Sequence, residues 1–443
     1  MSVCKYYLMT LGCQMNKSDS ERIAALLDRM GLEETRRQAE ADVIIINSCS
    51  VRQTAEDRVF GKMKDFKKLR AKRPNLIVAV TGCLPGRDQD GAIRAKMPEA
   101  DLFFPIKDLP QLPRRIAGLN PALATSGDAE ADYLKITPRY ASKFQAFVTL
   151  QTGCKKFCTY CVVPFARGFG GNRPAGDVLA EVRGLAAAGT IEVTLLGQAI
   201  NTYEAPDPAV FSAANPYRNH FAALLWEVNQ VSGIRRVNFT GAHPMNMTEE
   251  VIDALALPKQ VNFLHLPVQA GNNEVLRRMN RRYTREQYLE IIRKVRARVP
   301  GIALGSDIIV GFCGETAEQF EDTVSLYKEA DFDISYNAMY STRSGTQAAK
   351  LYQDDVPRTE KKRRWNVLQQ LMEETVLRKN QAYLGRTVEV LVEQRGEGWC
   401  GGNSRELKLV RFPTAADLRG RLVRVRIDKA MEWMLTGVLE EAA

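Results

Sequence analysis

The chain lacks the apolar segments that membrane and exported proteins carry. No stretch of its 443 residues approaches the roughly 18 consecutive apolar residues that a membrane-spanning helix needs. The N-terminus, MSVCKYYLMT, has no basic region followed by an apolar run, as a secretory signal would have. We therefore expect a cytoplasmic protein with no membrane partner.

Two common site patterns are also missing. The sequence has neither a Gly-x-Gly-x-x-Gly turn between a strand and a helix nor a lysine-bearing phosphate loop, so it predicts no ATP or NAD site of those types. The paired C-x-x-C units of structural zinc sites are absent. Nine cysteines in a cytosolic chain of this length nevertheless favour metal or redox chemistry over disulfides.

Composition and charge allow a globular protein with a polyanionic partner. Hydrophobic residues make up 45% and charged residues 26%, and the length allows two or three domains. The net charge of +10 suits RNA, because Lys and Arg neutralise phosphates and release counterions. Many basic proteins bind no nucleic acid specifically, so the net charge alone does not establish an RNA partner.

The most informative stretch is a cysteine motif in the middle of the chain, Cys154-Lys-Lys-Phe-Cys158-Thr-Tyr-Cys161. It follows the apolar run 144–151, which we interpret as a buried strand ended by Gly153. Three cysteines at this spacing can bind three irons of a cubane [4Fe-4S] cluster and leave the fourth iron open to a substrate. A zinc loop or unrelated core cysteines are the alternatives.

Residues 1–118 have the pattern of an α/β domain with a parallel sheet, because short apolar β-rich runs alternate with helical stretches. The expected strands are Lys5–Thr10, Val43–Asn47 and Leu76–Thr81. The expected helices are Asp19–Met30, with Ser18 as its cap and Gly31 at its end, and Thr54–Ala71.

A cysteine follows each of these three strands. They are Cys13 in Gly-Cys-Gln-Met-Asn, Cys49 in Asn-Ser-Cys-Ser-Val-Arg, and Cys83 in Thr-Gly-Cys. The carboxyl ends of neighbouring parallel strands lie side by side, so the three thiols can converge and hold a second cubane. Three small buried thiols are the alternative. Cys4 and two later cysteines, Cys313 and Cys400, stand outside both sets and are interpreted as incidental.

The central motif, with an aromatic residue before its last cysteine, resembles that of radical S-adenosylmethionine (SAM) enzymes. Together with the three N-terminal cysteine motifs it resembles the methylthiotransferase family over nearly the whole chain. Gly12-Cys-Gln-Met-Asn16 with Cys49-Ser-Val-Arg52 is similar to the MiaB type, which modifies isopentenylated adenosine beside the tRNA anticodon. The alternatives are family branches that act on threonylcarbamoyl-adenosine or on a ribosomal protein, and a non-catalytic RNA-binding protein with structural zinc.

The resemblance implies two [4Fe-4S] clusters and SAM used in two ways. One SAM donates a methyl group to sulfur at the Cys13/Cys49/Cys83 cluster. A second, bound at the Cys154/Cys158/Cys161 cluster, is cleaved to the radical that removes the adenine C2 hydrogen, which a methylthio group replaces. The tRNA anticodon stem-loop, an electron donor such as flavodoxin or ferredoxin and a monomeric state belong to this expectation.

After a linker at 119–139, residues 140–375 form the expected radical SAM domain. Six strands alternate with helical stretches, which suits the partial (β/α)6 barrel that the resemblance implies. The expected strands are Phe144–Gln151, Glu192–Leu196, Arg236–Thr240, Asn262–Pro267, Ala303–Val310 and Asp333–Met339.

Polar residues at the ends of these strands are candidates for SAM binding, because ligands of such folds lie at the carboxyl ends of the strands. The candidates are Gln198, His265, Gln269, Ser306 and Asp307. His265 is equally well explained as a structural histidine.

Residues 376–443 form the expected C-terminal unit. A long expected helix, 357–384, runs into it, and after this helix the sequence turns to a period of two. Strands at Thr387–Glu393, Leu407–Phe412 and Leu422–Asp428, with a Gly-rich turn at 396–402, indicate a small β-barrel that resembles an RNA-binding TRAM domain. Candidate phosphate contacts in the chain are Arg167, Arg281, Arg282, Lys361–Arg364, Arg411, Arg421, Arg424 and Arg426. Solvated basic surfaces are the alternative.

The chain departs from the family pattern at four positions, Thr152, Cys313, Ser344 and Gly402. None of them is a cysteine of either set. Gly402 stands where the barrel commonly has arginine, which puts the RNA contacts of the barrel in doubt.

Overall fold

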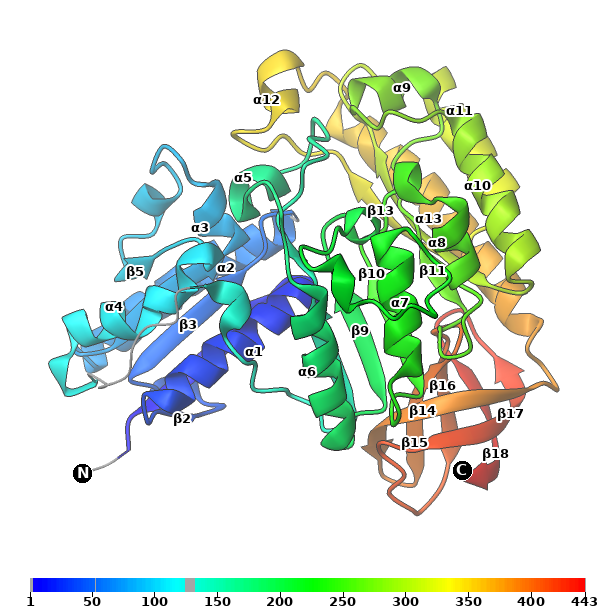
Figure 1. Cartoon of the computed structure of the whole chain (residues 1–443). Coiled ribbons are helices and arrows are strands. Elements are labelled where there is room, and N and C mark those ends of the chain that lie inside the picture. Colours follow the sequence, from blue (N-terminus) through cyan, green and yellow to red (C-terminus); the bar gives the residue numbers. More distant parts are fainter. Residues whose placement is uncertain (1–2, 52, 124–131, 443) are drawn as a thin grey trace.

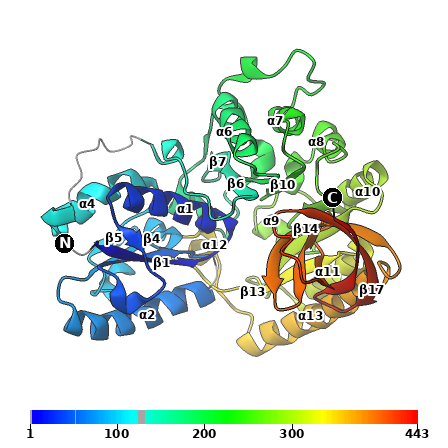
Figure 2. The ribbon, with the colours of Figure 1, turned by 90° about the horizontal axis from the view of Figure 1, so that it is seen from below.

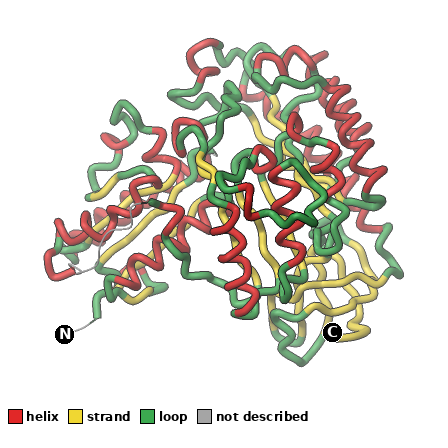
Figure 3. Tube along the Cα trace, in the orientation of Figure 1, coloured by secondary structure: helices red, strands yellow, loops and turns green. Residues whose placement is uncertain are grey.

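Three units follow one another along the chain, as the colours of Figure 1 show. The computed structural model describes residues 3–51, 53–123 and 132–442. Arg52 and residues 124–131 of the expected linker lie outside the described residues. Figure 3 shows helices around the strands of the first two units and a C-terminal unit made mainly of strands. The domain boundaries expected from the sequence stay predictions.

The N-terminal unit is built on a five-stranded parallel sheet in the order β2-β1-β3-β4-β5. Its strands are β1 (Lys5–Leu11), β2 (Glu33–Glu34), β3 (Val43–Ser48), β4 (Ile77–Gly82) and β5 (Leu102–Phe103). Its α-helices are α1 (Gln14–Arg29), α2 (Gln53–Lys72), α3 (Cys83–Arg87) and α4 (Leu112–Leu119). Alternate residues of β3 are buried in two separate cores, so helices cover both faces of the sheet.

Helix α1 begins five residues earlier than the sequence suggested, so the prediction that Ser18 caps it was wrong. Cys13 precedes the first turn, and the Asn16 side-chain oxygen accepts a hydrogen bond from the Cys13 backbone N–H at 3.3 Å. Ser18 lies buried within the helix, with its hydroxyl 3.2 Å from that of Thr149 in the central unit. The first turn is polar, and it therefore shows no apolar periodicity in the sequence.

The central unit contains six parallel strands in two three-stranded sheets, β10-β9-β6 and β11-β12-β13. They are β6 (Gln145–Thr149), β9 (Glu192–Leu196), β10 (Arg236–Thr240), β11 (Phe263–His265), β12 (Ala303–Val310) and β13 (Ile334–Met339). A bridge between Val237 and Gln260 joins the segments around β10 and β11. The prediction of a partial (β/α)6 barrel is confirmed.

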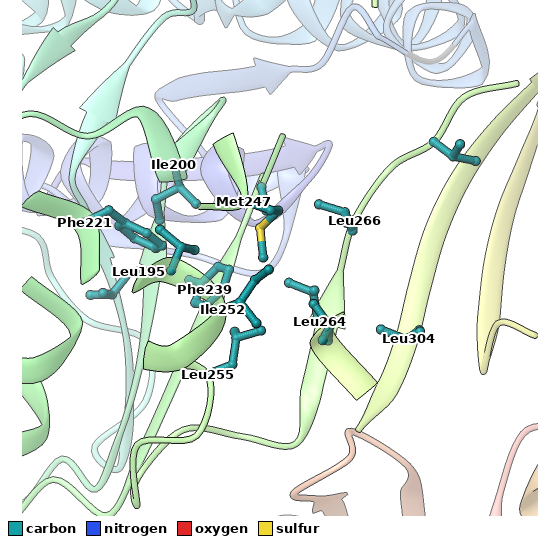
Figure 4. Close-up of a cluster of buried hydrophobic side chains, with 14 of the residues drawn as sticks. Leu195, Ile200, Phe221, Phe239, Met247, Ile252, Leu255, Leu264, Leu266 and Leu304 are labelled. Atoms are coloured by element: carbon teal, nitrogen blue, oxygen red, sulfur yellow. The ribbon is translucent and has the colours of Figure 1, made fainter. Parts of the chain in front are cut away.

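Helices follow the strands of the central unit and cover its outer surface (Figure 1). The longer ones are α6 (Ala175–Ala187), α7 (His220–Gln230), α8 (Glu249–Ala254), α9 (Asn273–Arg278), α10 (Arg285–Arg298) and α11 (Ala317–Ala330). Figure 4 shows Leu195, Phe239 and Leu264 from three strands beside Phe221 of α7 and Ile252 of α8. Close packing of these buried side chains holds the strands in place, and therefore also the loops that follow the carboxyl ends of the strands.

The C-terminal unit is a closed five-stranded barrel in the order β14-β15-β16-β18-β17, preceded by α13 (Arg358–Gln381). Its strands are β14 (Thr387–Gly396), β15 (Trp399–Ser404), β16 (Leu409–Pro413), β17 (Leu422–Ala430) and β18 (Leu435–Ala442). The small β-barrel is confirmed, but the predicted turn at 396–402 was wrong, because it contains most of β15. A Cβ at Gly402 would lie 1.7 Å from the Leu391 carbonyl oxygen, so close strand approach requires this glycine.

The barrel contacts the central unit at the amino ends of the strands, opposite the cysteine loop. Arg236, the first residue of β10, donates from its guanidinium to the Asn403 carbonyl at 3.0 Å. Lys408 lies 3.4 Å from Asp333, which immediately precedes β13. Figure 2, seen from below, places the barrel and the N-terminal unit on different sides of the molecule.

The helices of the described residues include none that is both long enough and apolar enough to cross a membrane.

Candidate active site

The first cysteine set lies at the carboxyl edge of the N-terminal sheet. β1, β3 and β4 are neighbours, and Leu11 is level with Ser48, which is level with Gly82. Cys13, Cys49 and Cys83 follow these strand ends directly or after one residue. The strand order therefore brings together three thiols that are far apart in sequence. Cys13 is exposed, whereas Cys49 and Cys83 are buried.

The second set lies on a loop after β6 and the short strand β7 (Gln151–Thr152). Cys154, Cys158 and Cys161 are each half-buried. The Cys154 N–H donates to the Gly168 carbonyl at 3.1 Å, and the Thr159 N–H donates to the Met279 carbonyl at 3.1 Å. These two hydrogen bonds attach the loop to neighbouring segments, so they fix the three cysteines relative to one another.

A buried arginine donates to one sulfur of each set. The Arg167 Nε lies 3.2 Å from Cys83 Sγ, and the Arg281 Nη1 lies 3.4 Å from Cys158 Sγ. Both side chains are buried, so the interpretation of Arg167 and Arg281 as phosphate contacts was wrong. Sequence reveals a cation but not its burial, and these two cations face sulfur rather than solvent.

The thiols of both sets are unfavourable sites for isolated negative charge. Burial raises the pKa of Cys83 to about 11, against a smaller lowering by Arg167. Burial, with a contribution from Cys158, raises the pKa of Cys161 to about 12. Metal binding requires thiolates, and a cluster together with the buried arginines would supply the compensating charge.

The fit to a cluster rests on the donor sets themselves. Each set has three thiols, and the sulfurs receive further N–H donors: Val51 N–H lies 3.3 Å from Cys49 Sγ and Val163 N–H 3.5 Å from Cys161 Sγ. Donors of this kind stabilise thiolate ligands of iron–sulfur clusters. Within the described residues, no three His, Cys, Asp or Glu side chains are grouped to hold a metal ion. A cubane differs from such a site because each cysteine binds a separate iron.

The two sets are joined by the short helix α5 (Val163–Arg167), which begins two residues after Cys161. Arg167 at its end reaches Cys83 and also forms a buried ion pair with Asp19 of α1. α5 packs on α3, and a Cβ at Gly86 of α3 would lie 2.1 Å from the Ala166 carbonyl oxygen. One short helix thus connects the loop of one cysteine set to a cysteine of the other. Figure 1 shows α5 beside α3.

Three of the predicted SAM contacts lie at or after the carboxyl ends of central strands, since His265 ends β11 and Gln198 and Gln269 follow β9 and β11. Ser306 and Asp307 instead lie in the middle of β12. His265 Nε2 lies 3.2 Å from the carboxylate of Asp307, across the β11–β12 pair. The Ser306 hydroxyl is buried and already has three backbone partners, the Val268 N–H at 3.0 Å and the carbonyls of Leu266 at 3.2 Å and Asp307 at 3.5 Å. Gln269 is buried with a positive φ of 78°, and Gln198 is half-buried after β9. Their roles toward SAM stay predictions.

His243, two residues after the loop glycine that ends β10, was missed by the sequence reasoning. Its imidazole is buried, and neither ring nitrogen has a hydrogen-bond partner. Burial, with smaller contributions from Arg281 and Lys156, lowers the pKa of His243 to about 2, so the ring is neutral. Neutral imidazole offers one donor and one acceptor, so an unpartnered one beside the cysteine loop fits a polar ligand. Its position after a strand could have identified it.

Of the remaining candidate phosphate contacts, some are buried and bonded to other protein groups, and others are exposed to solvent. Lys361 is buried and donates to the Tyr340 carbonyl at 3.2 Å, and Arg364 is buried 2.7 Å from Glu315. Both were wrongly interpreted as phosphate contacts. The candidates that are largely exposed are Arg282, Lys362, Arg363, Arg421, Arg424 and Arg426. Arg411 stacks over Trp399, with 4.3 Å between its guanidinium carbon and the ring centroid.

Two family models match the chain. Residues 148–327 match the Radical SAM superfamily, and residues 5–105 match a family described as Uncharacterized protein family UPF0004. The first range covers the cysteine loop and most central strands. The second covers the whole N-terminal sheet with its three cysteines.

A solved structure shares the fold. The chain aligns with the cobalamin- and [4Fe-4S]-bound radical S-adenosylmethionine methyltransferase TsrM of Kitasatospora setae, with a TM-score of 0.55, 14% identity, and coverage of 78% of this chain and 77% of that one. At this identity the likeness concerns the fold alone.

Curated relatives match nearly the whole chain. A protein of Moorella thermoacetica named tRNA-2-methylthio-N(6)-dimethylallyladenosine synthase is 40% identical over 98% of this chain and 97% of its own length. One of the same name from Carboxydothermus hydrogenoformans is 39% identical over 99% of this chain and 100% of its own length. Membership of this group implies SAM and a [4Fe-4S] cluster as cofactors. The chain is an enzyme that belongs to the radical SAM methylthiotransferase family.

Proposed function

We propose that this enzyme replaces the C2 hydrogen of N(6)-isopentenyladenosine, beside the anticodon of tRNA, with a methylthio group. The observation that supports this best is the connection of two three-cysteine sets through α5, with Arg167 bonded to a cysteine of the other set. Methylthiolation of an unactivated carbon needs a radical source and a sulfur donor at one substrate atom. Two joined sets in one chain can provide both.

The cysteines divide between the two tasks. Cys154, Cys158 and Cys161 would hold the cluster that binds SAM, and Cys13, Cys49 and Cys83 would hold a second [4Fe-4S] cluster for the sulfur. When bound, SAM supplies both the methyl group and the 5′-deoxyadenosyl radical. Arg281 and Arg167 would stabilise the anionic clusters through Cys158 and Cys83, because they already donate to these sulfurs.

The protein would position SAM through polar groups on the central strands and on the loops that follow them. Gln198, His265, Gln269 and Asp307 are proposed contacts, and His243 is added because its ring nitrogens are buried without partners. The occupied hydroxyl of Ser306 favours an indirect role, in which it fixes the 266–268 segment beside His265.

The RNA partner is expected to be the anticodon stem-loop, with the C-terminal barrel as one binding surface. Arg421, Arg424 and Arg426 are exposed there, and alternate residues of β17 point to solvent. An electron donor such as flavodoxin or ferredoxin, a monomeric state and a cytoplasmic location complete the proposal. The related alternatives act on threonylcarbamoyl-adenosine or on a ribosomal protein.

The test is mass spectrometry of tRNA nucleosides from a deletion strain, complemented with the wild-type gene or with a Cys13→Ala gene. The expected result is loss of the methylthio group from isopentenyladenosine on deletion, restored by the wild type only. Normal 2-methylthio-isopentenyladenosine in the deletion strain, with loss from another base or from a ribosomal protein, would favour a related branch instead.

A further inference from the structure

Two exposed phenylalanines flank the central cysteine loop. Phe157 and Phe169 are 40% and 59% exposed as whole residues, and their ring centroids lie 5.5 Å apart with 34° between the planes. The chain has 17 phenylalanines, and these are the two exposed among the described residues. Exposing two rings together to water is unfavourable by roughly 25 cal/mol for each Å², so the pair calls for a ligand.

A side-chain hydrogen bond to its backbone helps to hold Phe157 in its exposed position. Its φ is +51°, a left-handed conformation that is uncommon for a bulky residue. The Asn280 side-chain amide donates to the Phe157 carbonyl at 2.9 Å and helps to fix this conformation. Strained backbone of this kind persists where the surroundings determine it, and it is concentrated at ligand sites.

Phe169 lies on a loop that is attached to the same cysteine set. Gly168 and Gly170 on either side have φ values of +83° and +91°, and the Gly168 carbonyl accepts from the Cys154 N–H. A Cβ at Gly153 would lie 2.2 Å from the Gly168 oxygen, so the loop is packed directly against the start of the motif. The rings thus come from two segments, each fixed to the cysteine loop.

The surroundings of the pair are cationic. Lys155 is exposed beside Phe157, and the Lys155 side chain lies near Gly170. Arg282 is exposed and bonded at 3.2 Å to the Asn280 side chain that holds Phe157. Aromatic rings interleaved with cations are the combination that binds single-stranded nucleic acid, since bases stack on the rings and phosphates meet the charges.

We propose that Phe157 and Phe169 form a stacking platform for an unpaired nucleobase of the RNA substrate. This proposal rests on the proposed function, because an unpaired anticodon-loop base next to the modified adenosine would meet the rings. The ring faces supply stacking without selecting one base, while Lys155 and Arg282 would contact the adjoining phosphates.

The test uses the full-length reconstituted enzyme and a fluorescein-labelled anticodon stem-loop RNA that carries isopentenyladenosine. Phe169→Leu should raise the Kd for RNA about 5- to 150-fold, the loss typical of one stacked base. Phe169→Tyr retains a ring and should bind within about 3-fold of wild type, since the π-face is what stacks. Leu119→Ala, which removes an exposed apolar side chain from the end of α4, is the matched control.

A double-mutant cycle identifies the base. Each loop nucleotide is replaced in turn by an abasic one, and the platform predicts a single position whose loss is not additive with Phe169→Leu. Wild-type affinity of Phe169→Leu, equal loss in Phe169→Tyr, or additivity at every position would overturn the proposal. So would a raised Kd for SAM with unchanged RNA affinity. Failure of the proposed function would appear separately, as absence of product with the wild-type enzyme.

Discussion

The two cysteine sets of this enzyme are assembled in different ways. Cys154, Cys158 and Cys161 are neighbours in sequence, and one loop gathers them. The N-terminal three are separated by more than thirty residues each, and only the order β1-β3-β4 gathers them. A local site needs one anchored loop, whereas a long-range site needs an entire sheet. The helix α5 then connects the one to the other.

The largest expected effects separate the roles of the two sets. Cys154→Ala should abolish cleavage of SAM to 5′-deoxyadenosine, because the open iron that binds SAM is lost. Cys13→Ala should retain SAM cleavage and abolish methylthio transfer. Each variant should hold about four irons instead of about eight after anaerobic reconstitution. Chromatography of 5′-deoxyadenosine and iron analysis measure this.

The control for the cysteine variants is Cys4→Ala, which alters a half-buried cysteine outside both sets. It should keep both clusters and full activity. Methylthiolated RNA from the Cys13→Ala enzyme would contradict the division of roles.

The next effect concerns the link between the sets. Arg167→Met leaves Asp19 buried without its cation, and breaking a buried pair typically costs about 3–5 kcal/mol. We expect this loss in the free energy of unfolding by urea, together with altered EPR signals of the cluster proposed at Cys13, Cys49 and Cys83. The double variant with Asp19→Asn should recover part of the stability.

Arg183→Met on α6 is the matched control, because Arg183 is exposed. Its effect should stay within about 0.5 kcal/mol. A loss below about 1 kcal/mol for Arg167→Met would mean that the buried pair does not hold the two units together.

A smaller effect is expected from the packing of α3 on α5. Gly86→Ala places a Cβ against the Ala166 backbone, and overpacking of this kind costs about 1–3 kcal/mol. In contrast, Gly61→Ala in α2 meets no neighbour and should stabilise the helix by about 0.5–1 kcal/mol. Urea unfolding of both variants measures the difference, and equal values would show that α3 can move away freely.

The smallest effect concerns a single hydrogen bond at the same junction. The Arg87 guanidinium of α3 donates to the Ser344 hydroxyl at 3.0 Å and to Glu56 at 2.9 Å. Ser344→Ala removes the first bond and should cost about 1 kcal/mol in unfolding free energy. Ser232→Ala, at an exposed serine, should change it by less than about 0.5 kcal/mol. An unchanged unfolding free energy for Ser344→Ala would mean that the Arg87–Glu56 ion pair, and not this hydrogen bond, stabilises the junction.

Strand positions followed from short-range patterns, so they could be predicted well. The predictions for Glu192–Leu196, Arg236–Thr240 and Ala303–Val310 match the observed bounds. The first turn of α1 and the strand β15 were not found, because a polar turn and a pair of glycines hide the usual periodicities. Tertiary contacts determined where α1 begins and where β15 forms.

Burial of charge was not predictable at all. Arg167, Arg281, Lys361 and Arg364 look like surface cations in the sequence, yet all are buried with specific partners. The acceptors are distant in sequence, and a single chain gives no signal for such pairing. For the same reason His243 was missed, although it lies three residues after β10, close to where Gln198 lies two residues after β9.

The sequence alone determined the spacing of Cys154, Cys158 and Cys161, the alternation of strands and helices, and the cysteine after each of three strands, because these patterns depend on residues near one another in the chain. The order of the N-terminal strands, which brings those three cysteines together, belongs to the tertiary structure. The tertiary structure alone decided which cations face sulfur, how α5 joins the sets, and that two phenylalanines stand exposed beside the loop. Those features depend on which distant segments become neighbours, and burial and packing set that only once the chain is folded.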